Sequence, residues 1–167
     1  MILVRVKLGV HKESGKEFAI KYLMSERLKS VNLAEYFKDE IETLKELVHP
    51  NIIRLKEAYP EGTLVKDDGS NEQVMYIVLE LAEQGDLFDY IAKIAACDER
   101  TTLHYFKQLI EALEYMHNEG VCHRDLKLQN FMLNNEYELK LADFGFSISL
   151  AGRDGSGDLY THKGTPG

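Results

Sequence analysis

Apolar and polar positions alternate at the start of the chain, and this pattern predicts two strands. Apolar residues recur at every second position, which is the period of a half-buried strand. Residues 11–16 (HKESGK) then read as a turn with Gly15 at its tip, and residues 17–23 as a second strand. We therefore expect a β-hairpin here. The apolar residues of its first strand are Val4, Val6, Leu8 and Val10.

The next apolar residues follow a helical period. Phe37, Ile41, Leu44 and Val48 are separated by four, three and four positions, so they would share one face of a helix. Residues 49–51 (HPN) should end this helix, because proline disfavours a helical conformation in the residue before it.

Two further strands are predicted at residues 52–58 and 74–81. Residues 61–73 (EGTLVKDDGSNEQ) lie between them and are polar and rich in turn formers, which indicates a solvent-exposed loop.

From Gly85 onward the pattern is mainly helical. A helix is predicted over residues 103–117, with Asp98 as its N-cap and Gly120 in a left-handed C-terminal cap. Strands with one helix, followed mostly by helices, predict an α+β chain of two lobes joined near residues 81–85. The residues that keep helical spacing are Leu103, Phe106, Ile110, Leu113 and His117.

Composition favours an ordinary folded protein. Hydrophobic residues make up 44% of the 167 residues and charged residues 29%, as in globular rather than disordered chains. The net charge of −8 argues against a sequence-independent nucleic-acid binder, which needs a basic surface. Cys97 and Cys122 are isolated thiols, and no apolar run suits a signal peptide or a membrane span. We expect no membrane association and a cytoplasmic, or else nuclear, location.

The most specific pattern lies in the second half of the chain. Residues 123–130 (HRDLKLQN) are followed, thirteen positions after Asn130, by Asp143-Phe144-Gly145. These residues resemble the catalytic loop and the metal-binding motif of eukaryotic-type serine/threonine protein kinases. The resemblance implies a bilobal fold, in which a small antiparallel sheet with one helix precedes a mainly helical lobe. It also implies transfer of the γ-phosphate of Mg-ATP to Ser or Thr of protein substrates.

The resemblance assigns roles that suit the chemistry of each side chain. Asp125 would orient the substrate hydroxyl or accept its proton, and Lys127 would neutralise the γ-phosphate. Asn130 and Asp143 would ligate Mg²⁺, which prefers a few hard oxygen ligands together with phosphate oxygens. A structural turn with a buried Asp is the alternative, but it leaves the order of so many specified positions unexplained.

Two charged residues in the first half of the chain match the same family. Residues 18–21 (FAIK) resemble the strand whose lysine, here Lys21, binds the α- and β-phosphates. Glu40 on the following helix would pair with this lysine. Asp39 and Glu42 are competing carboxylates, but the apolar stripe places Glu40 on the side that faces the strands.

Residues 80–86 (ELAEQGD) resemble the hinge between the two kinase lobes. By position, Leu79 would be the gatekeeper beside the adenine. The backbone groups of Glu80 and Ala82 would form hydrogen bonds with the adenine edge.

Four further residues carry expectations with an ordinary alternative. Val6, Ala19 and Met132 fall where the family sandwiches the adenine ring, although plain core residues would look the same. Asp86 would contact ribose or a basic residue of the substrate, whereas an acidic residue at a helix start is commonly a cap.

A regulatory site is implied in the segment after Asp143. Thr161 falls where many relatives are phosphorylated by an upstream kinase, and Arg124 would be the basic partner of such a phosphate. Ser156 and Tyr160 remain alternatives. The acidic balance of the chain and Asp86 suggest substrates with basic residues near the target Ser or Thr.

The resemblance also has gaps. No glycine-rich phosphate loop precedes Val6, and no Ala-Pro-Glu follows residue 167. We therefore expect a domain cut at both ends, with residues 1–80 as the N-terminal lobe, 81–85 as the hinge and 86–167 as part of the C-terminal lobe. Apolar surface on the 103–117 helix would then be exposed.

Two readings of function follow. One is an active kinase, similar in residues 49–53 (HPNII) and 88–91 (FDYI) to the calmodulin-dependent and AMP-activated group. The other is a catalytically inactive truncated kinase that acts as a nucleotide- or protein-binding module.

Overall fold

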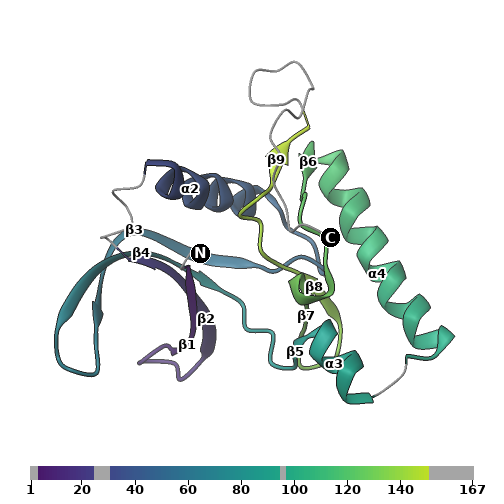
Figure 1. Ribbon diagram of the computed structural model, residues 1–167, viewed down its shortest axis with the longest axis horizontal. Coiled ribbons are helices and arrows are strands. Elements are labelled where there is room, and N and C mark those ends of the chain that lie inside the picture. The colour runs from purple at the N-terminus through teal and green to yellow at the C-terminus, as the bar shows by residue number, and fades with distance from the viewer. Residues whose placement is uncertain (1–3, 25–30, 95–96, 151–167) are drawn as a thin grey trace.

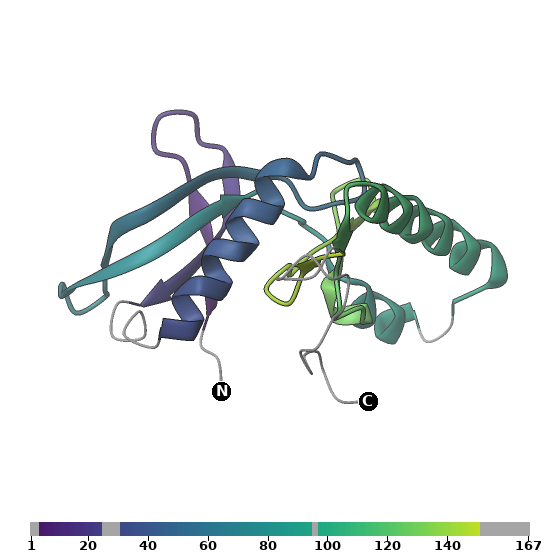
Figure 2. The ribbon, with the colours of Figure 1, turned by 90° about the horizontal axis from the view of Figure 1, so that it is seen from above.

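The structure is a computed structural model that describes residues 4–24, 31–94 and 97–150. Among these residues, strands and helix α2 form an N-terminal lobe, and helices α3 and α4 with short strands form a C-terminal lobe beside it (Figures 1 and 2). This arrangement confirms the predicted α+β class. In chain order the elements are β1 (Arg5–Val10), β2 (Glu17–Met24), α2 (Val31–Glu46), β3 (Leu55–Val65), β4 (Asn71–Leu79), β5 (Gly85–Asp86), α3 (Leu87–Ile94), α4 (Glu99–Asn118), β6 (Val121–Cys122), the 3₁₀ helix η1 (Leu128–Asn130), β7 (Phe131–Leu133), β8 (Leu139–Leu141) and β9 (Ile148–Ser149).

The N-terminal lobe is an antiparallel sheet with the strand order β1-β2-β4-β3. The predicted hairpin is confirmed, and Gly15 has a φ of +68° at its turn. The expectation of a half-buried β1 is wrong: β1 is an edge strand that, within the described part of the chain, pairs with β2 alone. Its apolar row is exposed, at 60% for Val6, 60% for Leu8 and 57% for Val10.

Helix α2 packs beside the sheet, on the side of the N-terminal lobe that faces the C-terminal lobe (Figure 2). Its predicted apolar stripe is buried as far as Leu44. The stripe then ends on Leu47, which is 1% exposed, and not on Val48, which is 56% exposed. Helical spacing fails at this point because the helix already stops at Glu46.

Residues 61–73 form a strand hairpin instead of the predicted loop. β3 continues to Val65 and β4 begins at Asn71, and these two residues pair. The last pair between β2 and β4 joins Met24 to Val74, so the end of the hairpin extends beyond β2 as a two-stranded ribbon. Polar residues fit such a ribbon because most of its positions are exposed to water, although Glu72 is buried. Only residues 66–70 form the turn.

The caps of α4 are those that the sequence predicts. The carboxylate of Asp98 accepts a hydrogen bond from the N–H of Thr101 at 2.7 Å. At the other end, Gly120 adopts a φ of +73°, and its N–H donates to the carbonyl of His117. Both caps depend on local sequence, which explains why they could be predicted.

The two faces of α4 differ from the predicted spacing. The predicted row combines exposed residues, such as Leu103, with the half-buried Leu113, and it contains none of the side chains that the helix buries. The buried side chains of the helix are Tyr105, Ala112 and Met116, whereas Leu103, Phe106 and Ile110 are exposed.

Two main-chain segments connect the lobes within the described residues. Residues 80–84 lead from β4 into β5, which joins the small sheet β5-β7-β8. The segment after α2 also touches this sheet, because Ile52 forms a parallel bridge with Leu141 of β8. One buried core runs through both lobes. Among the described residues, no helix has the length and apolar content that crossing a bilayer requires.

Candidate active site

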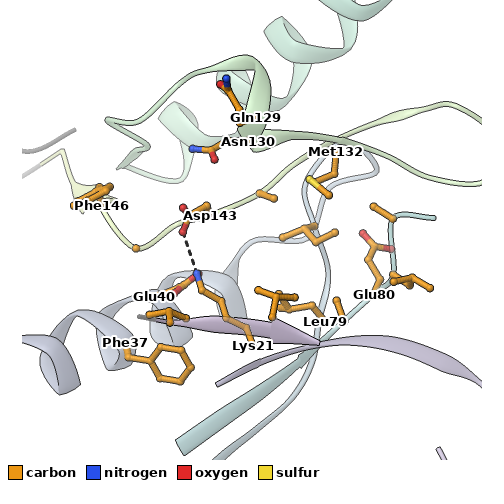
Figure 3. A pocket seen from close by; sticks show the side chains of 18 residues that line it. Lys21, Phe37, Glu40, Leu79, Glu80, Gln129, Asn130, Met132, Asp143 and Phe146 are labelled. Atoms are coloured by element: carbon orange, nitrogen blue, oxygen red, sulfur yellow. Dashed lines mark hydrogen bonds and ion pairs between the residues drawn. The ribbon is translucent and has the colours of Figure 1, made fainter. Parts of the chain in front are cut away.

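A pocket of about 530 Å³ lies between the lobes. Its walls come from β1, β2, α2 and β4 on one side, and from η1, β7 and the residues after β8 on the other. Figure 3 shows Lys21, Glu40 and Asp143 converging at one end of this pocket, with Leu79, Glu80 and Met132 toward the other end. The pocket therefore has a charged end and a largely apolar end.

Lys21 joins the two lobes at the charged end. Its Nζ lies 2.6 Å from Oε1 of Glu40 and 3.0 Å from Oδ1 of Asp143. The competing carboxylates Asp39 and Glu42 are exposed on the other side of α2. The structure thus pairs Lys21 with the predicted carboxylate, and it adds Asp143 as a second partner.

The charges at this end stabilise one another. Burial by itself lowers the pKa of Lys21, but the carboxylates of Glu40 and Asp143 outweigh burial and raise this pKa above its ordinary 10.5. Burial by itself would raise the pKa of Asp143, but the Lys21 ammonium lowers it below its ordinary 3.8. Lys21 is therefore a cation and Asp143 an anion at neutral pH.

The catalytic-loop residues form one hydrogen-bonded group. Oδ2 of Asp125 lies 2.7 Å from Nζ of Lys127. Nδ2 of Asn130 donates to the carbonyl of Asp125 at 2.7 Å and to its Oδ2 at 3.1 Å. Asp125 is only 4% exposed, so these donors compensate for the water that its carboxylate has lost.

Two residues in the loops of the site have an uncommon backbone conformation. Arg124 has a φ of +65° and Asp143 a φ of +63°, a region that costs a non-glycine residue about 1–3 kcal/mol. Tertiary hydrogen bonds oppose this cost. Nε of Arg124 donates to the carbonyl of Phe146 at 2.8 Å, and the N–H of Ala142 donates to the carbonyl of Asn130 at 2.9 Å.

His123 packs between these two loops. Its Nε2 lies 3.0 Å from the carbonyl oxygen of Ala142. Its ring packs edge-on against the ring of Phe144, with 4.9 Å between the two ring centroids. Burial lowers the pKa of His123 below its ordinary 6.5. The ring is therefore neutral at neutral pH, and its N–H donates to Ala142.

The apolar end of the pocket contains the predicted gatekeeper and hinge. Leu79 is 8% exposed and lines the pocket together with Glu80 and Ala82. The N–H of Glu80 donates to the carbonyl of Arg54 at 2.9 Å. The hydrogen bonds found among the described residues involve neither the Glu80 carbonyl nor the Ala82 N–H, so a ligand edge has one acceptor and one donor to meet there.

The structure places most of the other predicted binding residues at the same pocket. Val6, Ala19 and Met132 line it. Asp86 is not among the lining residues, and its Oδ1 accepts a hydrogen bond from the N–H of Asp89 at 2.8 Å as a cap of α3. Its contact with ribose or substrate stays a prediction.

Sequence reasoning missed several lining residues. Most of them are apolar or small and come from segments far apart in the chain, and those that lie inside the quoted motifs carry no charge that would have singled them out. They are Val4, Phe37, Ile53, Leu81, Gln129, Ala142, Gly145 and Phe146.

The pocket residues also fit a magnesium ion. Asn130 donates through Nδ2 to Asp125, which leaves its amide oxygen as a ligand, and Asp143 supplies a carboxylate across the pocket (Figure 3). Among the described residues, no three His, Cys, Asp or Glu side chains cluster as a metal site. Magnesium suits a sparser set, because it commonly takes one or two protein ligands together with phosphate oxygens.

The predicted phosphorylation site lies outside the described residues. Thr161, like its alternatives Ser156 and Tyr160, belongs to residues 151–167. Arg124, its expected partner, donates a hydrogen bond to the carbonyl of Phe146, and its contact with a phosphate stays a prediction.

Comparison with known proteins agrees with this geometry. The family model for the protein kinase domain matches residues 3–167. CBL-interacting serine/threonine-protein kinase 26 of Arabidopsis thaliana is 38% identical over 162 residues, which cover 97% of this chain and 35% of that protein. NUAK family SNF1-like kinase 1 of Homo sapiens is 36% identical over 143 residues, which cover 86% of this chain and 20% of that protein. The chain thus spans about a third or less of the length of these curated relatives.

These relatives confirm the expected resemblance to the calmodulin-dependent and AMP-activated group. The match covers nearly the whole chain and includes every charged residue assembled at the pocket. The chain belongs to the protein kinase family.

Proposed function

We propose that this chain transfers the γ-phosphate of ATP, in the presence of Mg²⁺, to Ser or Thr hydroxyls of protein substrates. One observation carries the proposal: Lys21 joins Glu40 and Asp143 at the pocket, and Asn130 on the same pocket is hydrogen-bonded to the carboxylate of Asp125. These residues meet the needs of phosphoryl transfer, which are positioning and charge stabilisation.

Each residue of the site has a role in this proposal. Asp125 orients the substrate hydroxyl and accepts its proton, and Lys127 beside it places positive charge near the transferring phosphoryl group. Lys21, held by Glu40, binds phosphate oxygens of the nucleotide. The gatekeeper Leu79, the backbone of Glu80 and Ala82, and the apolar walls receive the adenine.

Magnesium and nucleotide belong to this proposal. Asn130 and Asp143 would hold the ion, which when bound neutralises charge on the phosphate oxygens. The substrates are proteins, and the acidic net charge of −8 favours basic residues beside the target hydroxyl. We propose residues 1–80, 81–85 and 86–167 as N-terminal lobe, hinge and C-terminal part of the kinase domain.

The test is phosphate transfer by the whole protein to Ser/Thr peptides with Mg-ATP. Wild type should label the peptide, and Asp125→Asn should lower kcat by about 10²- to 10⁴-fold, because Asn cannot accept the proton. ATP binding by calorimetry should be unchanged in this variant. Asp67→Asn, an exposed substitution in the β3–β4 turn, is the matched control and should match wild type.

Two results would reject the proposal. One is wild-type kcat in Asp125→Asn. The other is metal-dependent ATP binding by wild type without transfer to any Ser/Thr peptide, which would favour a nucleotide-binding module.

A further inference from the structure

Gln108 lies on the face of α4 that meets both the segment after α2 and strand β8. Its Oε1 accepts two hydrogen bonds, one from Nδ2 of Asn51 at 2.9 Å and one from the N–H of Leu139 at 2.7 Å. A main-chain N–H can only donate, so Leu139 fixes the orientation of the Gln108 amide. Nε2 of Gln108 then faces Nε2 of His104, at 2.7 Å.

The two segments held by Gln108 also bind each other. Nδ2 of Asn51 donates to the carbonyl of Leu139 at 2.9 Å, and the N–H of Leu141 donates to the carbonyl of Asn51 at 2.8 Å. The N–H of Ile53 in turn donates to the carbonyl of Leu141 at 2.9 Å. We call the three residues Gln108, Asn51 and Leu139 the Gln108 clamp.

The clamp connects the two segments that carry the partners of Lys21. Asn51 comes five residues after the end of α2 at Glu46, and α2 carries Glu40. Leu139 begins β8, and two residues after the end of β8 comes Asp143. A shift of β8 against the α2 segment would therefore change the distance between the two carboxylates that bind Lys21.

Two members of the clamp are buried and Gln108 is half-buried, so water has limited access to replace the lost hydrogen bonds. Asn51 is 7% and Leu139 1% exposed. Without the Gln108 oxygen, the Leu139 N–H has no acceptor unless β8 moves or water enters. Movement of β8 would carry Asp143 with it, because only Ala142 separates the strand from that residue.

We infer that Gln108 is a positioning residue for phosphoryl transfer, acting through Asn51 and β8 on the relative placement of Glu40 and Asp143. This inference rests on the proposed function. Gln108 itself does not line the pocket, so a nucleotide bound there would not touch it. It should therefore affect kcat more than the KM for ATP.

The test uses four variants of the whole protein. Gln108→Leu removes the acceptor, and Gln108→Asn keeps the amide but is one methylene too short to reach both donors. Gln108→Glu retains an oxygen for Asn51 and Leu139. Lys107→Leu, at a highly exposed position next to it, is the matched control. The readouts are kcat, the KM for ATP and hydrogen exchange at the Leu139 and Leu141 amides.

The Leu and Asn variants should lose about tenfold or more in kcat at little change in KM, since misplacing a reacting group by about 1 Å costs on this order. Their Leu139 and Leu141 amides should exchange faster. Gln108→Glu should restore kcat, and its Leu139 and Leu141 amides should exchange as slowly as those of wild type. Lys107→Leu should match wild type in all readouts. If the Leu variant fails to fold, the Asn variant carries the same comparison.

The outcomes separate this inference from the proposed function. Unchanged exchange in the Leu and Asn variants overturns the clamp, even if wild type transfers no phosphate and the proposed function fails. Faster exchange with wild-type kcat overturns the positioning role. A Gln108→Glu variant whose kcat is as low as that of Gln108→Leu overturns it too.

Discussion

At the scale of single residues, Lys21 and Glu40 are two charges that can be buried because they are paired. Glu40 is 3% exposed, and the side chain of its partner Lys21 is 10% exposed. Removing one partner of a buried pair typically costs about 3–5 kcal/mol, whereas an exposed pair such as Lys107 with Glu111 contributes about 0–1 kcal/mol. Replacing either Lys21 or Glu40 alone should therefore destabilise the fold, in addition to any effect on the proposed function.

His123 makes the stability of the chain depend on pH. Burial lowers its pKa in the folded state, so between that pKa and its ordinary 6.5 the unfolded chain binds more protons. The free energy of unfolding should then fall as pH drops below about 6.5, by at most about 1.4 kcal/mol per pH unit. Above that pH the contribution is fully present.

The measurement is denaturant unfolding of wild type and His123→Gln at pH 7.5, 6.5 and 5.5. Gln does not titrate, and its amide can still donate to the Ala142 carbonyl. The pH dependence of the variant should be shallower than that of wild type. Parallel curves would contradict the prediction, since all other histidines are common to both proteins.

At the scale of elements, the helix ends that local capping residues determine were predictable, whereas the strand ends that backbone pairing determines were not. Asp98 and Gly120 cap α4 through hydrogen bonds within a few residues of the chain. The hairpin that replaces the predicted loop at 61–73 depends on backbone pairs such as Val65 with Asn71. Polar composition alone cannot separate a loop from a largely exposed strand hairpin.

Gly120 should show the cost of the left-handed cap by itself. A Cβ added there would meet no atom within 4 Å, so Gly120→Ala introduces backbone strain without a clash. We expect a loss of about 1–2 kcal/mol in the free energy of unfolding, and a smaller loss for Gly120→Asn, because Asn tolerates this conformation. Denaturant unfolding measures both variants. Glu119→Ala, at an ordinary φ of −78°, is the control, and a fully stable Gly120→Ala would contradict the argument.

At the scale of the whole molecule, both lobes leave apolar side chains in water. Leu103, Phe106 and Ile110 form a row on the exposed face of α4, as the sequence led us to expect for this helix. On the other lobe, Leu8 of β1 is equally open. Contiguous apolar surface of this kind promotes association in water.

The 167-residue chain should therefore associate as its concentration rises. The paired substitution Phe106→Lys and Ile110→Lys should weaken this association, because it places charge on the exposed α4 face. Sedimentation velocity over a concentration series measures the effect. Val65→Lys, an equally exposed apolar site on the β3–β4 ribbon, is the control. Unchanged association in the α4 variant would exclude this face as the cause.

The sequence by itself determined the family and the α+β class, and it predicted the charged residues that meet at the pocket. Motifs such as residues 123–130 and 143–145 were sufficient, because phosphoryl transfer restricts both residue type and spacing. The partner of Lys21 was also predictable, since helical periodicity shows which carboxylate of α2 faces the sheet.

Tertiary structure alone decided how these parts meet. It made Asp143 a second partner of Lys21, ended the α2 stripe at Leu47, and exposed the apolar row of β1. It also brought Gln108 against Asn51 and Leu139, residues with no shared local pattern. Most of these contacts join segments far apart in the chain, whereas periodicity, caps and motifs are local. That difference in range is the physical reason why periodicity, caps and motifs could be read from the sequence and the tertiary contacts could not.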